Sequence, residues 1–323
     1  MKHSLLALIL GAVSASALAA PSYEAQCEAL AAKPYPAAHR GGKQAACSPV
    51  DLYYGIGTPA DPVRARQCAL ASNGDDQPFR EDRGVLMMVY ANGQGVARDY
   101  ALARKAACEA GGAVAEVSMR LEHLGQMEAG KARGPIDVCD HATSGYMGGW
   151  CAKKSNDLKE QKQGAGFAKL IALWSAPQKQ AFARLESRAN DFFDVRSSEE
   201  VDLSGTARAA FSIREEARQR DDFRASVAAF EKGALPRDSD AEFARLDARL
   251  NAVYKQLRAL PKSEYGSIGF DGIQRTQRSW LAYRDAWVAF GKVKYPKVTA
   301  NAWRAYFTRK RIAMLEKLAR EIT

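Results

Sequence analysis

The positions of the cysteines constrain this chain more than any other feature of its sequence. All six lie within the first 151 of 323 residues: Cys27, Cys47, Cys68, Cys108, Cys139 and Cys151. The segment from Cys139 to Cys151 therefore marks a change in the character of the chain. Short helix–turn units are expected before it and long amphipathic helices after it. The sequence thus predicts an all-α protein built from two modules.

The first residues are typical of a secretory signal peptide. Lys2 and His3 precede an apolar run over residues 5–17, and Ala17-Leu18-Ala19 fits the small-x-small cleavage pattern. We expect cleavage after Ala19. No cysteine lies at that junction, so a lipid anchor is not expected. Because no long apolar run follows, no transmembrane segment is expected. These features predict a periplasmic or secreted protein.

Export predicts that the cysteines form disulfides. We expect pairing in chain order, Cys27 with Cys47, Cys68 with Cys108 and Cys139 with Cys151, while other pairings stay open. Four neighbouring residues also have the ligand chemistry of a metal site: Cys139, Asp140, His141 and Cys151. An oxidising compartment favours the disulfide, so neither a metal nor a cofactor is predicted.

A repeat with an offset of 38 residues follows an entry segment at 20–51, in which one helix is expected over 22–32. The matching positions are Gly55 and Gly93, Gly57 and Gly95, Asp61 and Asp99, Ala65 and Ala103. Glycine can end a helix, aspartate can cap the next one, and alanine lets two helices approach closely. The stretch from Val89 to Tyr100 resembles a Sel1-like repeat. This resemblance implies a small helical solenoid over 52–125 that binds other proteins, although the same residues could serve packing alone.

The Cys139–Cys151 segment is expected to be a compact surface loop. A polar stretch at 126–134 precedes it, and the pairs Ser144-Gly145 and Gly148-Gly149 predict turns. A closed ring of this length would present His141, Tyr146 and Trp150. We therefore predict that these three residues contact a partner.

The second half of the chain predicts long helices over 135–232 and 236–323. Ser175 can cap a helix with Pro177 in its first turn, and Ser204 can cap one from Thr206 to Phe230. Ser239 and Glu242 form a capping box before a strongly amphipathic helix. A further helix is expected from Ile273 until residues 292–296 break it, and the last from about Thr299.

The spacing of polar and aromatic residues over 239–319 resembles the LprI-type lysozyme-inhibitor family. The matching positions are Leu250, Asn251, Tyr254 and Leu257, then Gln277, Trp280, Tyr283, Arg284 and Asp285, then Thr308, Arg311 and Leu315. The Cys139–Cys151 segment also resembles an upstream element of some members. The resemblance implies a small helical module that binds a lysozyme-type muramidase. Where members commonly carry a pair of cysteines, this chain has Val288 and Trp303, which indicates that packing replaces a crosslink.

Residues Leu185–Arg196 align weakly with Ile273–Arg284, which indicates an internal duplication. Trp280, Tyr283 and Trp287 are expected in the core. Arg284 and Asp285 either contact a partner or form a buried network together with Gln277. No nucleophile with a base and no recognisable pair of acid/base carboxylates stands out, so an enzyme is not predicted.

Charge separates the two halves of the protein. The formal net charge is +10, and the chain from residue 236 onward holds 18 Lys and Arg against 9 Asp and Glu. Such a module favours acidic partners such as anionic glycans, lipid headgroups or an acidic protein. Nucleic acid is not expected as a partner of an exported protein. Because many lysozymes are basic, an inhibitor would use the near-neutral half or the Cys139–Cys151 segment. The alternative function is a Sel1-like periplasmic adaptor, or an immunity protein that neutralises a delivered toxin.

Overall fold

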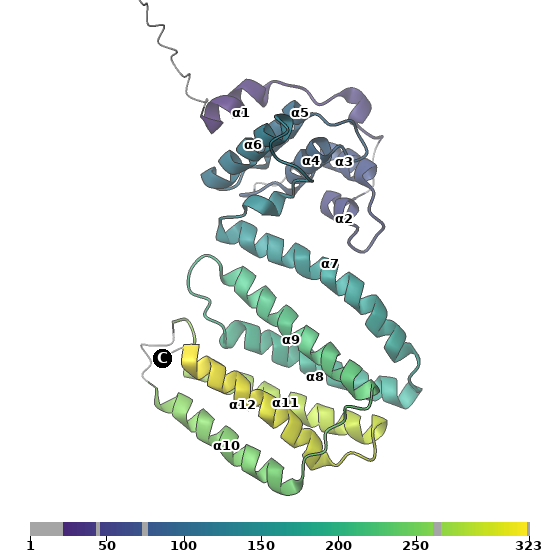
Figure 1. The fold of residues 1–323 in the computed structure, drawn as a ribbon, viewed down its shortest axis with the longest axis vertical. Coiled ribbons are helices and arrows are strands. Elements are labelled where there is room, and N and C mark those ends of the chain that lie inside the picture. The colour runs from purple at the N-terminus through teal and green to yellow at the C-terminus, as the bar shows by residue number, and fades with distance from the viewer. Residues whose placement is uncertain (1–21, 43–45, 73–76, 261–265, 322–323) are drawn as a thin grey trace, which may run out of the picture.

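The protein is helical throughout the part that the computed structural model describes, residues 22–42, 46–72, 77–260 and 266–321. Within these ranges it has twelve α-helices, two short 3-10 helices and no β-strand. The all-α prediction is confirmed. The predicted signal peptide, residues 1–19, lies outside the described residues. Figure 1 shows the helices in two groups, with the long helix α7 lying across the molecule between them.

The N-terminal group consists of eight short elements in which most neighbours along the chain pack on each other. They are α1 (Tyr23–Ala31), η1 (Ala37–His39), α2 (Pro49–Tyr54), α3 (Pro62–Ala71), α4 (Glu81–Asn92), α5 (Tyr100–Ala110), α6 (Val114–Glu128) and η2 (Val138–His141). The helix expected over 22–32 is present as α1. The stretch expected to be a linker from residue 126 is shorter than predicted, because α6 continues to Glu128.

The 38-residue repeat is a repeat of structure. Gly55 and Gly93 end α2 and α4 with φ of 74° and 68°, a left-handed conformation that suits glycine. Asp61 and Asp99 cap α3 and α5, each accepting a hydrogen bond from the backbone N–H three residues on, at 3.0 and 2.9 Å. Their own N–H groups donate to the carbonyls of residues 52 and 90. The two units therefore share one turn geometry, and the likeness to Sel1-like repeats remains a resemblance in sequence.

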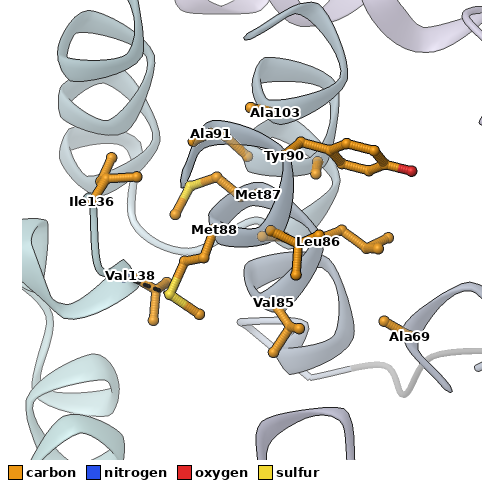
Figure 2. Packing of buried hydrophobic residues seen from close by; sticks show 14 of the residues in the cluster. Ala69, Val85, Leu86, Met87, Met88, Tyr90, Ala91, Ala103, Ile136 and Val138 are labelled. Carbon is orange, nitrogen blue, oxygen red and sulfur yellow. Dashed lines mark hydrogen bonds between the residues drawn. The ribbon is translucent and has the colours of Figure 1, made fainter. Parts of the chain in front are cut away.

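Helix α4 forms the centre of the N-terminal core. Its residues 85–91 are at most 1% exposed, and the core around them includes Ala69, Ala103, Ile136 and Val138 (Figure 2). The Met88 sulfur accepts a hydrogen bond from the Val138 backbone N–H at 3.4 Å and lies 3.2 Å from the Tyr54 hydroxyl oxygen. Side chains from well-separated parts of the chain thus converge on one helix, which anchors the segment leading into α7.

Two of the three predicted disulfides are wrong. The structure joins Cys27 to Cys108 and Cys47 to Cys68, with Cα–Cα distances of 5.5 and 6.1 Å. The reason is that α1 packs on α5, far along the chain, and this contact brings Cys27 to Cys108. Cys47, just before α2, then pairs with Cys68 on α3. Only the third prediction, Cys139 with Cys151, agrees with the structure.

The C-terminal group consists of long helices that pack in pairs: α8 with α11, α10 with α12, and α7 with α9. Their bounds are α7 (Gly145–Ala172), α8 (Ala176–Glu199), α9 (Arg208–Glu231), α10 (Asp240–Ala259), α11 (Phe270–Lys294) and α12 (Ala300–Glu321). The Ser239 hydroxyl caps α10 as expected, accepting from the Glu242 N–H at 3.2 Å. The expected cap at Ser204 is wrong, because its hydroxyl donates to Asp202 and α9 begins four residues later.

Aromatic side chains fill the core of the C-terminal group. Trp280, Tyr283 and Trp287 are buried, as predicted. Trp303, at one of the two positions where the family commonly has cysteine, is fully buried and stacks on Trp287 at 6.0 Å. A Cβ on Gly291 would lie 2.3 Å from its indole nitrogen, so glycine makes room for this ring. The same core contains side chains from α8 to α12, so residues on both sides of the expected boundary at 232–236 share it.

Candidate functional site

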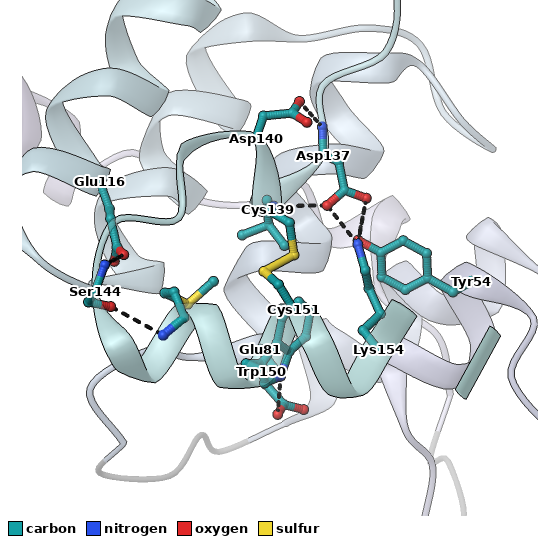
Figure 3. Close-up of a disulfide and its surroundings, with 12 residues drawn as sticks. Tyr54, Glu81, Glu116, Asp137, Cys139, Asp140, Ser144, Trp150, Cys151 and Lys154 are labelled. Atoms are coloured by element: carbon teal, nitrogen blue, oxygen red, sulfur yellow. Dashed lines mark hydrogen bonds and ion pairs between the residues drawn. A yellow bond between two sulfur atoms is a disulfide. The ribbon is translucent and has the colours of Figure 1, made fainter. Parts of the chain in front are cut away.

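The disulfide between Cys139 and Cys151 joins η2 to the second turn of α7. The two Cα atoms are 5.8 Å apart. Both thiols are used in this bond, so the metal site considered from the sequence cannot form there. Across the described residues, no cluster of three or more His, Cys, Asp and Glu side chains is placed to hold a metal ion. Figure 3 shows the disulfide at the centre of a group of polar contacts.

The expected surface loop is wrong, because Tyr146 and Trp150 lie on a helix. Residues 145–151 are the first turns of α7, and the Gly148-Gly149 pair is helical. A Cβ on Gly145 would lie 1.8 Å from the Thr206 carbonyl oxygen, and one on Gly149 would lie 2.9 Å from the Ala209 Cβ. These glycines therefore permit close packing of α7 against the start of α9 and its preceding loop. They do not make turns.

A buried carboxylate fixes the start of α7. Glu116 of α6 accepts hydrogen bonds from the backbone N–H groups of Thr143 and Ser144, at 2.8 and 2.7 Å. Burial alone would raise the pKa of Glu116, but these donors outweigh it and hold the pKa below its ordinary value. Ser144 in turn accepts from the Met147 N–H and caps α7.

A second polar group lies on the other side of the disulfide. The Lys154 ammonium donates to Asp137 at 2.8 Å and lies 4.4 Å from the centre of the Tyr54 ring. The Tyr54 hydroxyl donates to the same carboxylate at 2.8 Å, and burial together with that negative charge raises the pKa of Tyr54. These three groups satisfy one another, so they stabilise the junction between α2, η2 and α7.

Tyr146 lines a hollow of about 290 Å³, and Trp150 lies one turn further along the same side of α7. Tyr146 is 43% exposed and lines the hollow with Phe79, Arg80 and Glu81. The Trp150 indole N–H donates to Glu81 at 2.6 Å, and its ring packs edge-on against Phe79. Trp150 is therefore held in place, whereas Tyr146 is free to contact a partner. We name Tyr146, Arg80 and Glu81, together with Trp150 that binds Glu81, the Tyr146 hollow.

His141 lies near the same junction but not in the hollow. Its Nε2 atom is 2.8 Å from Nδ1 of His123 on α6, with the two rings perpendicular. Burial and the neighbouring His123 lower the pKa of His141. A hydrogen bond between two imidazoles requires that one nitrogen be unprotonated, so the geometry describes a pair with at least one neutral ring.

Arg284 and Asp285 lie on α11, in the C-terminal group of helices. The Arg284 guanidinium is mostly buried and lies 5.1 Å from the centre of the Trp280 ring, while the Asp285 side chain is 61% exposed. The Arg284 Nη2 and Asp285 Oδ1 atoms are 3.4 Å apart. The network expected with Gln277 is wrong, because Gln277 accepts a hydrogen bond from Arg311 instead. The structure thus divides the predicted contact residues between two parts of the molecule.

A buried ion pair that the sequence reasoning missed joins α8 to α12. Arg311, fully buried, donates from Nη1 and Nη2 to both oxygens of Glu200, at 2.7 and 2.5 Å. Arg196 lies 3.4 Å from the same carboxylate and also pairs with Glu215. Arg311 and Gln277 are both positions of the LprI-like sequence pattern. Glu200, the carboxylate partner of Arg311, follows α8 and lies 111 residues from Arg311, so no local sequence signal marks it.

Arg311 in the C-terminal segment is therefore part of a buried structural ion network. Residues 224–315 match the family model described as Lysozyme inhibitor LprI. This segment is similar to the LprI family. The match runs from the last turns of α9 into α12 and begins earlier than the expected residue 239. No curated protein matches the chain, and neither does any solved structure.

The match to LprI indicates a binding function in general terms, because the family is named for inhibition. Three disulfides fit an extracellular or periplasmic protein. In the described part of the chain, no helix is both long and apolar enough to span a membrane. Glu200, the partner of the LprI motif residue Arg311, lies outside the matched segment, so the family segment and α8 depend on each other.

Proposed function

We propose that this exported protein binds a lysozyme-type muramidase and inhibits it by occluding its active-site cleft. The observation that carries the proposal is the match of residues 224–315 to the LprI lysozyme-inhibitor family. The aromatic core and the buried ion pair make this segment a rigid support. Rigid supports favour inhibition, because little conformational freedom is lost on binding.

The Tyr146 hollow is the surface that we assign to the partner. It combines an exposed aromatic ring with the exposed carboxylate of Glu81, whose position is fixed by Trp150. Aromatic residues with fixed neighbours are common at the centres of protein interfaces. The C-terminal module is strongly basic and would repel a basic muramidase, whereas this surface lies on the near-neutral half. Asp285 on α11 is the second predicted contact.

Inhibition is tested with the purified mature chain, residues 20–323, and a muramidase acting on cell-wall substrate. A stoichiometric excess is expected to abolish turnover. Tyr146→Ala is expected to weaken inhibition at least about tenfold, as for an interface anchor. Phe211→Ala is a matched control, because Phe211 is an equally exposed aromatic residue on α9. Unchanged muramidase activity with the wild-type chain would refute the function, and equal effects of both variants would refute the surface.

The second candidate function is a periplasmic adaptor or an immunity protein. The observation that favours it is the repeated helix–turn–helix geometry of α2–α3 and α4–α5, which is typical of helical protein-binding solenoids. A crosslinking pull-down from periplasm distinguishes the two candidates. It needs the full chain, because the N-terminal core extends to Met147 and a fragment ending near residue 124 would cut it. Specific capture of a protein that is not a muramidase, together with unchanged muramidase activity, would favour the adaptor.

A further inference from the structure

Three helices of the C-terminal group end at the same place. α7, α9 and α11 end at Ala172, Glu231 and Lys294. The Trp174 indole N–H donates to Glu231 at 3.2 Å. The Lys294 ammonium lies 4.8 Å from the centre of the Trp174 ring and 3.3 Å from the same carboxylate. These contacts bring the three helix ends together, and Figure 1 shows the ends of α7 and α9 on one side of the bundle.

Exposed lysines and two exposed apolar side chains surround this junction. Leu173 is 87% exposed and Val293 is 41% exposed. Lys169 lies one turn before Leu173 on the same face of α7. We name the following residues the lysine end: Lys169, Leu173, Lys232, Lys292, Val293 and Lys297. All four lysines are exposed, and none of them forms an ion pair with another described residue.

Helix ends alone do not account for this surface. A lysine near the C-terminus of a helix interacts favourably with the last carbonyl groups, and Lys179 does so by donating to the Ala172 oxygen at 2.9 Å. Glu231 is already engaged by Trp174, Tyr295 and Lys294. The helix dipole gives no reason for a leucine that is almost fully exposed beside these cations.

We propose that the lysine end binds the surface of a membrane that contains anionic phospholipids. Lysines near such a surface are attracted by its negative potential, and apolar side chains among them can enter the boundary between headgroups and acyl chains. The exposed Leu173 favours a lipid surface over an acidic protein or polymer. The Tyr146 hollow lies at the opposite end of α7, about 40 Å away at 1.5 Å per residue. A protein held at its lysine end would thus keep that hollow away from the membrane.

Vesicle co-sedimentation of the mature full-length chain tests this proposal. The probes are vesicles of phosphatidylcholine alone and of phosphatidylcholine with phosphatidylglycerol, at low and high salt. One variant replaces Lys169, Lys232, Lys292 and Lys297 by Gln. A control variant also replaces four exposed lysines by Gln, so that both variants have the same net charge. Its positions are Lys33, Lys131, Lys162 and Lys255. Leu173→Ala tests the apolar contribution, with Leu281→Ala as its control. Circular dichroism confirms that each variant is folded.

The wild-type chain is expected to sediment with phosphatidylglycerol vesicles at low salt and to be released at high salt. The lysine-end variant is expected to bind at least roughly tenfold more weakly, because each lysine contributes to the attraction. The control variant should stay within about twofold of wild type, and Leu173→Ala should bind more weakly while keeping its salt dependence. Three results would overturn the proposal: no binding to anionic vesicles, equal losses in both lysine variants, or binding to polyglutamate as tight as to vesicles with no effect of Leu173→Ala.

Discussion

The ion pair between Arg311 and Glu200 is the contact whose loss should cost most at the scale of a single residue. Glu200→Ala leaves a fully buried guanidinium without the carboxylate that both of its Nη atoms contact. We expect a loss of about 3–5 kcal/mol in the free energy of unfolding, measured by urea titration. Glu199→Ala is the matched control, because the adjacent Glu199 pairs with the half-exposed Arg275 and should contribute less than about 1 kcal/mol. Similar losses in the two variants would contradict this assignment.

The pair of His123 and His141 gives a prediction for pH. Burial lowers the pKa of His141 below its ordinary value of 6.5, so the unfolded chain takes up this proton at a higher pH than the folded chain. Stability is therefore expected to fall as the pH drops below about 6.5. The lowered pKa values of Glu109 and Glu116 affect stability only at lower pH, below their ordinary value of 4.5.

Urea unfolding at pH 7.5, 6.5 and 5.5 tests the role of the pair. The variant His141→Asn cannot take up the proton, so it should lose less stability on acidification than the wild-type chain. The same pH dependence in both proteins would show that other groups are responsible.

At the scale of the element, the glycines of α7 have opposite roles along one helix. A Cβ on Gly145 would overlap the Thr206 carbonyl, whereas one on Gly166 would meet nothing within 4 Å. Gly145→Ala is therefore expected to destabilise the protein by about 1–3 kcal/mol through overpacking. Gly166→Ala should stabilise it by about 0.5–1 kcal/mol, because alanine favours the helix. Thermal unfolding of both variants measures the sign, and a stabilising Gly145→Ala would contradict the close packing of α7 on the loop before α9.

Some elements of the fold could be predicted from the sequence, and others could not. Local signals were sufficient for the helix start at Ser239 and for the repeated turns with Asp61 and Asp99, because a cap depends on residues three positions apart. The turn predicted at Gly148-Gly149 is wrong, because the role of Gly149 depends on Ala209 of another helix. The disulfide partner of Cys27 and the carboxylate partner of Arg311 could not be predicted for the same reason. Both depend on contacts between helices that are distant in the sequence. In the candidate site, the exposure of Tyr146 and the fixed Trp150 could be learned only from the fold.

At the scale of the whole molecule, the two groups of helices are stabilised in different ways. All three disulfides lie in the N-terminal group and the start of α7, while the C-terminal core contains four of the five tryptophans and no cysteine. Helix α7 contributes to both, with Met147 in the first core and Phe167, Leu170 and Ile171 packed on the second. A reducing agent should therefore weaken one group and leave the other almost unchanged.

Scanning calorimetry with and without a thiol reductant measures this difference. We expect two transitions, of which reduction lowers only the one belonging to the N-terminal group. Each disulfide contributes about 2–4 kcal/mol, which for a small domain corresponds to a shift of more than about 10 °C for the three together. Tryptophan fluorescence assigns the unshifted transition, because Trp174, Trp280, Trp287 and Trp303 lie in the C-terminal core. A single transition that moves as a whole on reduction would show instead that α7 couples the two cores into one cooperative unit, since unfolding of either core would then unfold the other.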